Sequence, residues 1–177
     1  GMLYLTNLEL VFEGRDIGLT VVPCYYERLV TEWLPRESGG GLVASHIPDS
    51  PAVTNYATDE KGRNFLTNGH QIIDTAYHYF LVQHPETKVW YQAIAPFKST
   101  ALKASRRMNS TINTTMIPGT NTRAPRFMNS WQLTTRKEQK DSYVWSSPSL
   151  ELKGMVSADV YAAAKAFAIV AAKGLLR

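Results

Sequence analysis

The chain has 177 residues, 44% hydrophobic and 19% charged, which fits one globular domain with a sizeable core. Its single cysteine excludes an internal disulfide, and no apolar run approaches the roughly 20 residues that cross a bilayer, so we expect a soluble, cytoplasmic protein without membrane contact. Residues 98–140 carry nine Lys or Arg and one Glu, so the net charge of +4 is +8 there and −4 in the remainder.

The first elements in chain order are two strands. Leu8 to Glu13 is short, and a turn separates it from Leu19 to Trp33, a long run rich in Val, Tyr and Leu. Pro23 lies in the middle of the long strand, where proline requires a sheet edge or a bulge. Long strands bent at such positions are typical of sheets that curl into barrels.

The segment from about 37 to 69 has little periodicity. It is mostly Gly, Ser, Pro, Asn, Asp and Thr, and an irregular stretch of this length is functional or disordered in most compact domains. We therefore expect a long flexible loop. Arg36 followed by the glycines Gly39–Gly41 fits either a mobile clamp around a ligand or slack chain.

Four more strands are predicted after the loop. Gln71 to Gln83 and Val89 to Phe97 form a hairpin around a His-Pro turn. Phe127 to Lys137 and Ser142 to Lys153 form a second pair, joined by a polar turn. Each strand of this second pair has one apolar and one polar parity, so one face remains free for contacts.

A basic amphipathic helix is predicted between these two hairpins. Ser99 or Thr100 can cap it, and its apolar residues recur at spacings of three and four: Ala101, Ala104, Met108 and Ile112. The other side of the helix carries Lys103, Arg106, Arg107 and Ser110. This basic side is either a solvated face or an anion-binding surface.

A second helix is predicted at the end of the chain, over about residues 157–173. Ser157 is its expected N-cap, Asp159 its first-turn acid, and Gly174 its terminator. A narrow apolar stripe runs along it: Val160, Ala164, Phe167 and Val170 or Ala171. The stripe packs either on the domain itself or on a second subunit, and the second alternative predicts a homodimer.

This order of elements predicts the fold class. Five to six strands with one internal and one C-terminal helix favour a mainly β, OB-fold-like barrel formed by residues 1–177 as a single domain. An α+β protein with helices on an antiparallel sheet is the alternative.

The basic segment is interleaved with aromatic residues, and single-stranded nucleic acid is bound by cations on its phosphates and aromatic rings on its bases. For any single aromatic residue a place in the core is the commoner role. We nevertheless expect a non-catalytic nucleic-acid-binding surface. Its candidate residues are Arg36, Lys98, Lys103, Arg106, Arg107, Asn109, Arg123, Arg126, Trp131 and Arg136.

Four stretches carry a resemblance to known proteins: residues 19–23, 32–36, 75–78 and 99–110. In these stretches the chain resembles a group of small bacteriophage and prophage proteins, which are associated with phage single-stranded DNA-binding proteins of OB-fold type. The resemblance implies DNA rather than RNA as the partner, a role in replication or recombination, and a location in the bacterial host cytoplasm. It also makes Lys103, Arg106, Arg107 and Asn109 shared polar helix residues. The chain departs from that group by ending Gly174-Leu175-Leu176-Arg177 instead of in an acidic tail, which puts partner recruitment by a tail in doubt.

Two other classes of function remain as alternatives. A nucleic-acid-processing enzyme lacks support because no metalloprotease, phosphate-loop or paired-carboxylate motif occurs, and His78 among tyrosines is typical of a core histidine. We expect no enzymatic activity, cofactor or metal. A phage structural or assembly protein is the second alternative, with the alanine-rich terminal helix as an oligomer contact.

Overall fold

The structure, a computed structural model, describes residues 2–5, 10–13 and 18–174, and the side chains of residues 18–174. The predicted strand from Leu8 falls partly outside the described residues. Two compact units divide the chain. Unit 1 comprises Gly1–Tyr26, His78–Ala95 and Lys103–Arg177, and unit 2 comprises Glu27–Tyr77 and Pro96–Leu102.

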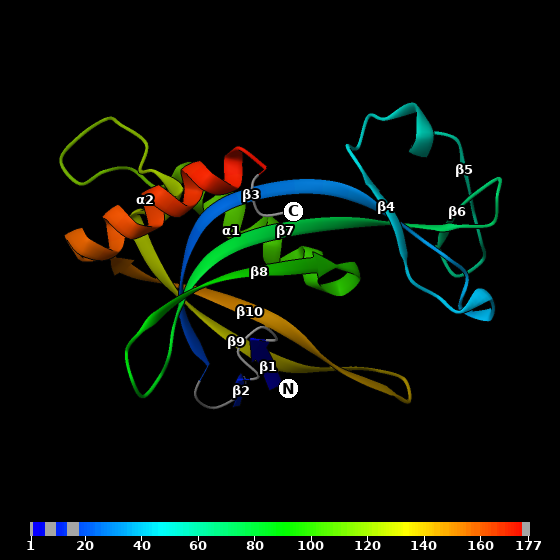
Figure 1. Ribbon diagram of the computed structural model, residues 1–177. Coiled ribbons are helices and arrows are strands. Elements are labelled where there is room, and N and C mark those ends of the chain that lie inside the picture. The colour runs from blue at the N-terminus through cyan, green and yellow to red at the C-terminus, as the bar shows by residue number, and fades with distance from the viewer. Residues whose placement is uncertain (1, 6–9, 14–17, 175–177) are drawn as a thin grey trace. The chain divides into compact units, whose positions relative to one another are not determined.

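Ten strands and two α-helices are present among the described residues (Figure 1). The strands are β1 (Met2–Leu5), β2 (Leu10–Glu13), β3 (Leu19–Trp33), β4 (Leu42–His46), β5 (Tyr56–Thr58), β6 (Asn64–Leu66), β7 (Gln71–Gln83), β8 (Trp90–Lys98), β9 (Asn129–Lys140) and β10 (Tyr143–Met155). The helices are α1 (Leu102–Thr114) and α2 (Ala158–Ala172).

β1 and β2 pair with each other, and the other strands form one eight-stranded sheet. Its order is β10-β9-β3-β7-β6-β5, with β4 paired to β3 and β8 paired to β7. The predicted fold class is confirmed: the protein is mainly β, with an antiparallel sheet, one internal helix and one C-terminal helix. The sheet has more strands than the predicted five to six because the 37–69 segment adds three short ones.

Pro23 lies in β3 between the stretch that pairs with β9 and the stretch that pairs with β4. β3 pairs antiparallel with β9 over Leu19–Val21 and with β4 over Val30–Trp33. The missing N–H of Pro23 therefore falls where neither β9 nor β4 needs it. The sequence predicted an edge or a bulge at this proline, and the strand order places β3 between β9 and β7 rather than at the edge of the sheet.

The core of unit 1 covers both faces of its central strands. Consecutive residues are buried in β3 and again in β7, and a strand buries consecutive residues only when both of its faces are covered. These runs are Val21 to Cys24 and His78 to Val82. On one face Tyr79 lies 6.3 Å from Phe167 of α2, and on the other His78 contacts Ser105 of α1. The two helices thus lie on opposite faces of the strands (Figure 1).

Both helices differ from prediction in detail. A 3-10 turn, Ser99–Ala101, precedes α1, so neither Ser99 nor Thr100 is its α-helical N-cap. The residues of α2 that are buried are Ala164, Phe167 and Ala171. Because Phe167 is only 3% exposed, the stripe predicted as a dimer contact is covered by the chain's own core.

Unit 2 contains the segment predicted as an irregular loop. This part of the prediction is wrong in secondary structure, since β4, β5 and β6 lie within it. The strands are only three to five residues long and several of their residues are polar, so they show no clear alternation in the sequence. The flexibility of residues 37–69 remains a prediction.

Candidate functional site

The basic face of α1 is present and exposed. Lys103, Arg106 and Arg107 point away from the buried residues of the helix, which are Ser105, Met108 and Ile112. None of the three cations forms an ion pair with a described carboxylate. We call these three side chains the α1 basic face. Its unneutralised charge can attract a polyanion.

Arg126 and Asn109, both predicted site residues, are brought together by the structure, although 17 residues separate them. Arg126 Nη1 donates a 2.8 Å hydrogen bond to Asn109 Oδ1, and its guanidinium lies 5.3 Å from the centroid of the Tyr26 ring. Burial lowers the pKa of Arg126. Its stacked and hydrogen-bonded position joins α1 to β3, so Arg126 acts in packing rather than on the α1 basic face.

His78 and Ser105 form the nearest approach to a catalytic pair in unit 1. Their Nε2 and Oγ atoms lie 2.8 Å apart, but His78 is fully buried and Ser105 is 1% exposed. Burial first, and then the positive charge of Arg126, lowers the pKa of His78 to about 3. So weak a base, beside a hydroxyl that solvent cannot reach, activates no nucleophile at neutral pH.

Cys24 is also buried in unit 1. Burial raises the pKa of its thiol to about 12, so the thiol stays protonated and unreactive. Its Sγ lies 3.3 Å from the carbonyl oxygen of Val22.

The remaining predicted residues of unit 1 are divided between surface and core. Arg123 and Arg136 are exposed. Trp131 is only 3% exposed, so its prediction as a base-stacking residue is wrong. It shares its parity on β9 with the buried residues Leu133 and Thr135, and this face of the strand turns toward the core. Tyr143, which follows the basic segment at the β9–β10 turn, is by contrast 75% exposed.

Arg36 and Lys98, the two predicted residues of unit 2, have different surroundings. Arg36 is exposed in the 3-10 turn Arg36–Ser38, whose C-cap is Gly39. The Lys98 ammonium lies 4.6 Å from the centroid of the Trp33 ring. This cation–π contact leaves the lysine exposed and covers the aromatic face.

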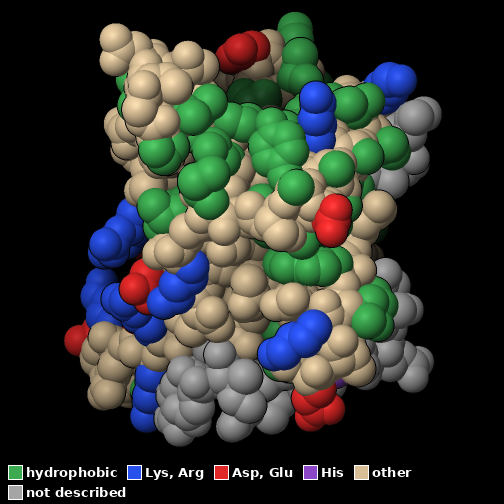
Figure 2. Space-filling view, turned by 90° about the vertical axis from the view of Figure 1, so that its left-hand side faces the viewer, with side chains coloured by type: hydrophobic (Ala, Val, Ile, Leu, Met, Phe, Trp, Pro, Cys, Tyr) green, Lys and Arg blue, Asp and Glu red, His purple; other side chains and the backbone are tan. Residues whose placement is uncertain are grey.

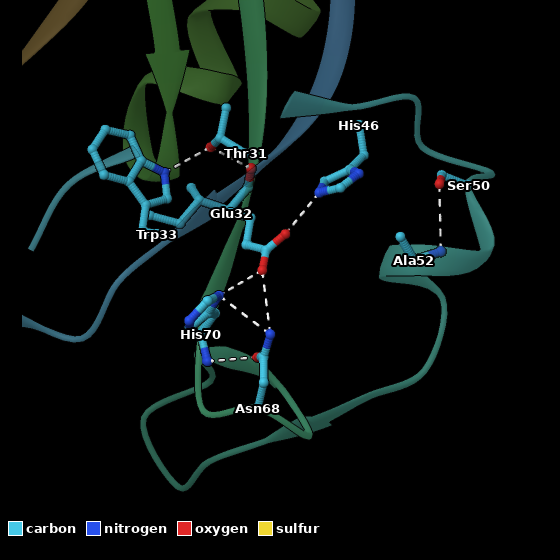
Figure 3. A network of polar contacts seen from close by, with 9 residues as sticks. Thr31, Glu32, Trp33, His46, Ser50, Ala52, Asn68 and His70 are labelled. Atoms are coloured by element: carbon cyan, nitrogen blue, oxygen red, sulfur yellow. Dashed lines mark hydrogen bonds and ion pairs between the residues drawn. The ribbon is translucent and has the colours of Figure 1, made fainter. Parts of the chain in front are cut away.

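A cluster around Glu32 in unit 2 was not predicted (Figure 3). Glu32 Oε2 accepts a 2.8 Å hydrogen bond from His46, and Oε1 accepts a 2.6 Å hydrogen bond from His70 and a longer one from Asn68. These bonds, that from His70 first, lower the pKa of Glu32. The cluster ties β3 to the end of β4 and to the turn before β7. Its members are up to 38 residues apart and follow no motif, so the sequence gives no signal for it.

Apolar side chains are exposed on several surfaces. Figure 2 shows them gathered in the upper half of one face, where α2 and the loop after α1 lie in Figure 1. The most exposed large ones in unit 1 are Val89, Ile94, Met116, Tyr143, Val144, Met155 and Ile169, and in unit 2 they are Leu42, Val43, Ile47 and Tyr56. Contiguous exposed apolar area, rather than single exposed residues, is what marks a contact surface on a protein.

Fold and surface together define a mainly β protein with a basic helix face, whose cations pair with no described carboxylate, and with exposed apolar side chains in both units. The profile of one protein family, described as Pam3 phage gp34-like protein, matches residues 1–176. The chain belongs to this bacteriophage family. No curated protein and no solved structure matches it. Within the described residues, no helix is both long and apolar enough to span a membrane.

Proposed function

We propose that this protein is a non-catalytic structural or assembly component of a phage particle, put together in the cytoplasm of the bacterial host. The observation that carries the proposal is the exposure of large apolar side chains in both units, such as Ile47 at 67% in unit 2 and Ile169 at 50% in unit 1. A subunit surrounded by neighbours has such surfaces, because each contact buries apolar area that the isolated chain leaves in water.

The sheet edge supports the same role. β10 is the terminal strand of the sheet order and pairs with β9 along its length. Its outer edge offers unpaired backbone groups to another chain. Pro148 and the register shift between Leu152 and Gly154 interrupt this edge, and such interruptions limit uncontrolled pairing.

The test is made on the phage that encodes the chain. Gradient-purified particles should contain the protein at a fixed copy number by quantitative mass spectrometry, or particle formation should stop when its gene is deleted. Infectious particles that lack the protein and form normally after the deletion would refute the proposal.

A second candidate function is the binding of single-stranded nucleic acid, DNA rather than RNA, in phage replication or recombination. The unpaired cations of the α1 basic face support it. Burial of Trp131 removes a predicted stacking residue, so in this proposal phosphate contacts dominate and sequence preference is weak.

This candidate is tested by titrating the protein with oligo-dT and oligo-rU at two salt concentrations. Replacing Arg106 and Arg107 together with Ala should weaken binding and reduce the salt slope by about 0.7 per lost contact. Lys153→Ala with Lys165→Ala, exposed cations outside the basic segment, is the matched control and should change neither. No binding by the wild type at low salt rules this function out.

A further inference from the structure

The outer face of α2 carries a regular pattern of exposed residues. Asp159, Ala162, Ala166, Val170 and Lys173 are all exposed and follow one another at spacings of three, four, four and three. Residues at these spacings lie on one side of a helix. The face is therefore symmetric in position about Ala166, and it carries an acid at one end and a base at the other.

The two charged ends cannot satisfy each other within one helix. Fourteen residues of helix place Asp159 and Lys173 about 21 Å apart. Neither side chain forms an ion pair with any other described residue. Between them the face is apolar, and flanking Ile169 is 50% exposed. The opposite side of α2 is already covered, since Phe167 packs 6.3 Å from Tyr79.

We propose that the outer face of α2 binds a second copy of this chain, with the two helices antiparallel and a twofold axis at Ala166. In this register Asp159 of each copy meets Lys173 of the other, and Ala162 meets Val170. Ala163, also exposed, meets Ile169. Each large side chain thus faces a small one, so the helices can approach to the short end of the usual interaxial range of about 8–10 Å.

Charge selects this partner and this orientation. A parallel pair would place Asp159 beside Asp159 and Lys173 beside Lys173, and like charges repel. A self-complementary face is what a twofold contact between identical chains requires. The proposal holds whether or not the protein is a particle component. It differs from the predicted dimer, whose stripe is centred on the buried Ala164 and Phe167 and shares only Val170 with the outer face.

Sedimentation velocity of the full chain tests the contact. A single helix pair is a small interface, so we expect a reversible dimer with a Kd on the order of micromolar. Asp159→Lys and Lys173→Asp each replace two attractive pairs with two repulsive ones. Each variant should therefore weaken dimerisation at least about ten-fold while its circular dichroism spectrum stays unchanged.

Mixing the two variants gives the decisive result. Asp159→Lys in one chain restores both opposite-charge pairs with Lys173→Asp in the other, so the equimolar mixture should form a heterodimer. The double variant should form a homodimer again. Lys165→Asp, a charge reversal on the same helix outside the face, is the control and should leave the Kd unchanged. A wild type that stays monomeric at about 0.5 mM, far above a micromolar Kd, or a mixture that stays monomeric, overturns the proposal. The proposal is also overturned if Lys165→Asp weakens the dimer as much as Lys173→Asp does.

Discussion

His78 is a single buried side chain that makes the folding stability of unit 1 depend on pH. Its ring is stacked 5.6 Å from Phe80 and lies 5.0 Å from Tyr26, so protonation would place a charge among aromatic rings. The pKa of His78 falls from 6.5 to about 3 in the folded protein. Below pH 6.5 the unfolded chain therefore binds a proton that the folded protein does not, and this favours unfolding.

We expect this linkage to be measurable. The His78 contribution is favourable above pH 6.5 and is lost progressively as the pH falls toward 3, so His78→Gln should make the stability of the protein flatter between pH 6.5 and about 4.5. Urea midpoints at several pH values measure the effect. An NMR titration in which the wild-type His78 resonance moves with a midpoint near 6.5 would contradict it.

Glu32 has a dependence of the same sign at lower pH. Its pKa is lowered from 4.5 by the hydrogen bonds of His70 and His46, so its stabilisation is present above about pH 4.5 and is lost as the pH falls through the folded-state pKa. Glu32→Gln should lower the free energy of unfolding at pH 7 by about 1–3 kcal/mol. The difference from wild type should shrink as the pH falls through the folded-state pKa of Glu32.

Glu60 is the matched control for this variant. It is exposed in the same unit, so Glu60→Gln should change stability by less than about 0.5 kcal/mol. An equal loss in both variants would mean that the Glu32 cluster does not stabilise unit 2.

At the scale of elements, the junction of β3 with β9 depends on Gly18. This glycine has a φ of +64°, and a Cβ there would lie 2.7 Å from both the Leu133 carbonyl oxygen and the Thr134 Cγ2. Backbone conformation and space therefore both require glycine at the start of β3.

Gly18→Ala should destabilise the protein by about 2–4 kcal/mol in urea unfolding, since left-handed strain and overpacking add. Gly62→Ala is its control. Gly62 also has a positive φ, +73°, but no atom lies within 4 Å of its added Cβ, so we expect only the strain, about 1 kcal/mol. Equal losses would show that crowding at Gly18 has no cost.

At the scale of the whole molecule, the division into two units predicts where each substitution acts. Compact units often open as separate cooperative units in hydrogen exchange. Glu32→Gln should speed exchange within residues 27–77 and leave α1 and α2 protected, whereas Gly18→Ala should speed exchange in unit 1. If both variants accelerate exchange evenly along the chain, the two units unfold as one.

The sequence by itself determined the local elements. Periodicity and punctuation located β3, β7, both hairpin pairs and both helices to within a few residues, because Gly, Pro and helix-capping residues act on their immediate neighbours. It also indicated which face of α1 is charged. The short strands β4, β5 and β6 escaped detection because their polar residues form no alternating pattern.

Only the tertiary structure decided what each side chain contacts. The sequence pattern of Trp131 fits a core or a stacking residue equally, and its burial depends on which face of β9 the rest of unit 1 covers. Likewise the apolar residues of α2 surround much of the helix, so only the position of the sheet distinguishes the buried Phe167 from the exposed Val170. Glu32, His46 and His70 meet because separate segments converge in space. Such long-range contacts depend on how the elements pack together, and no spacing along the chain encodes them.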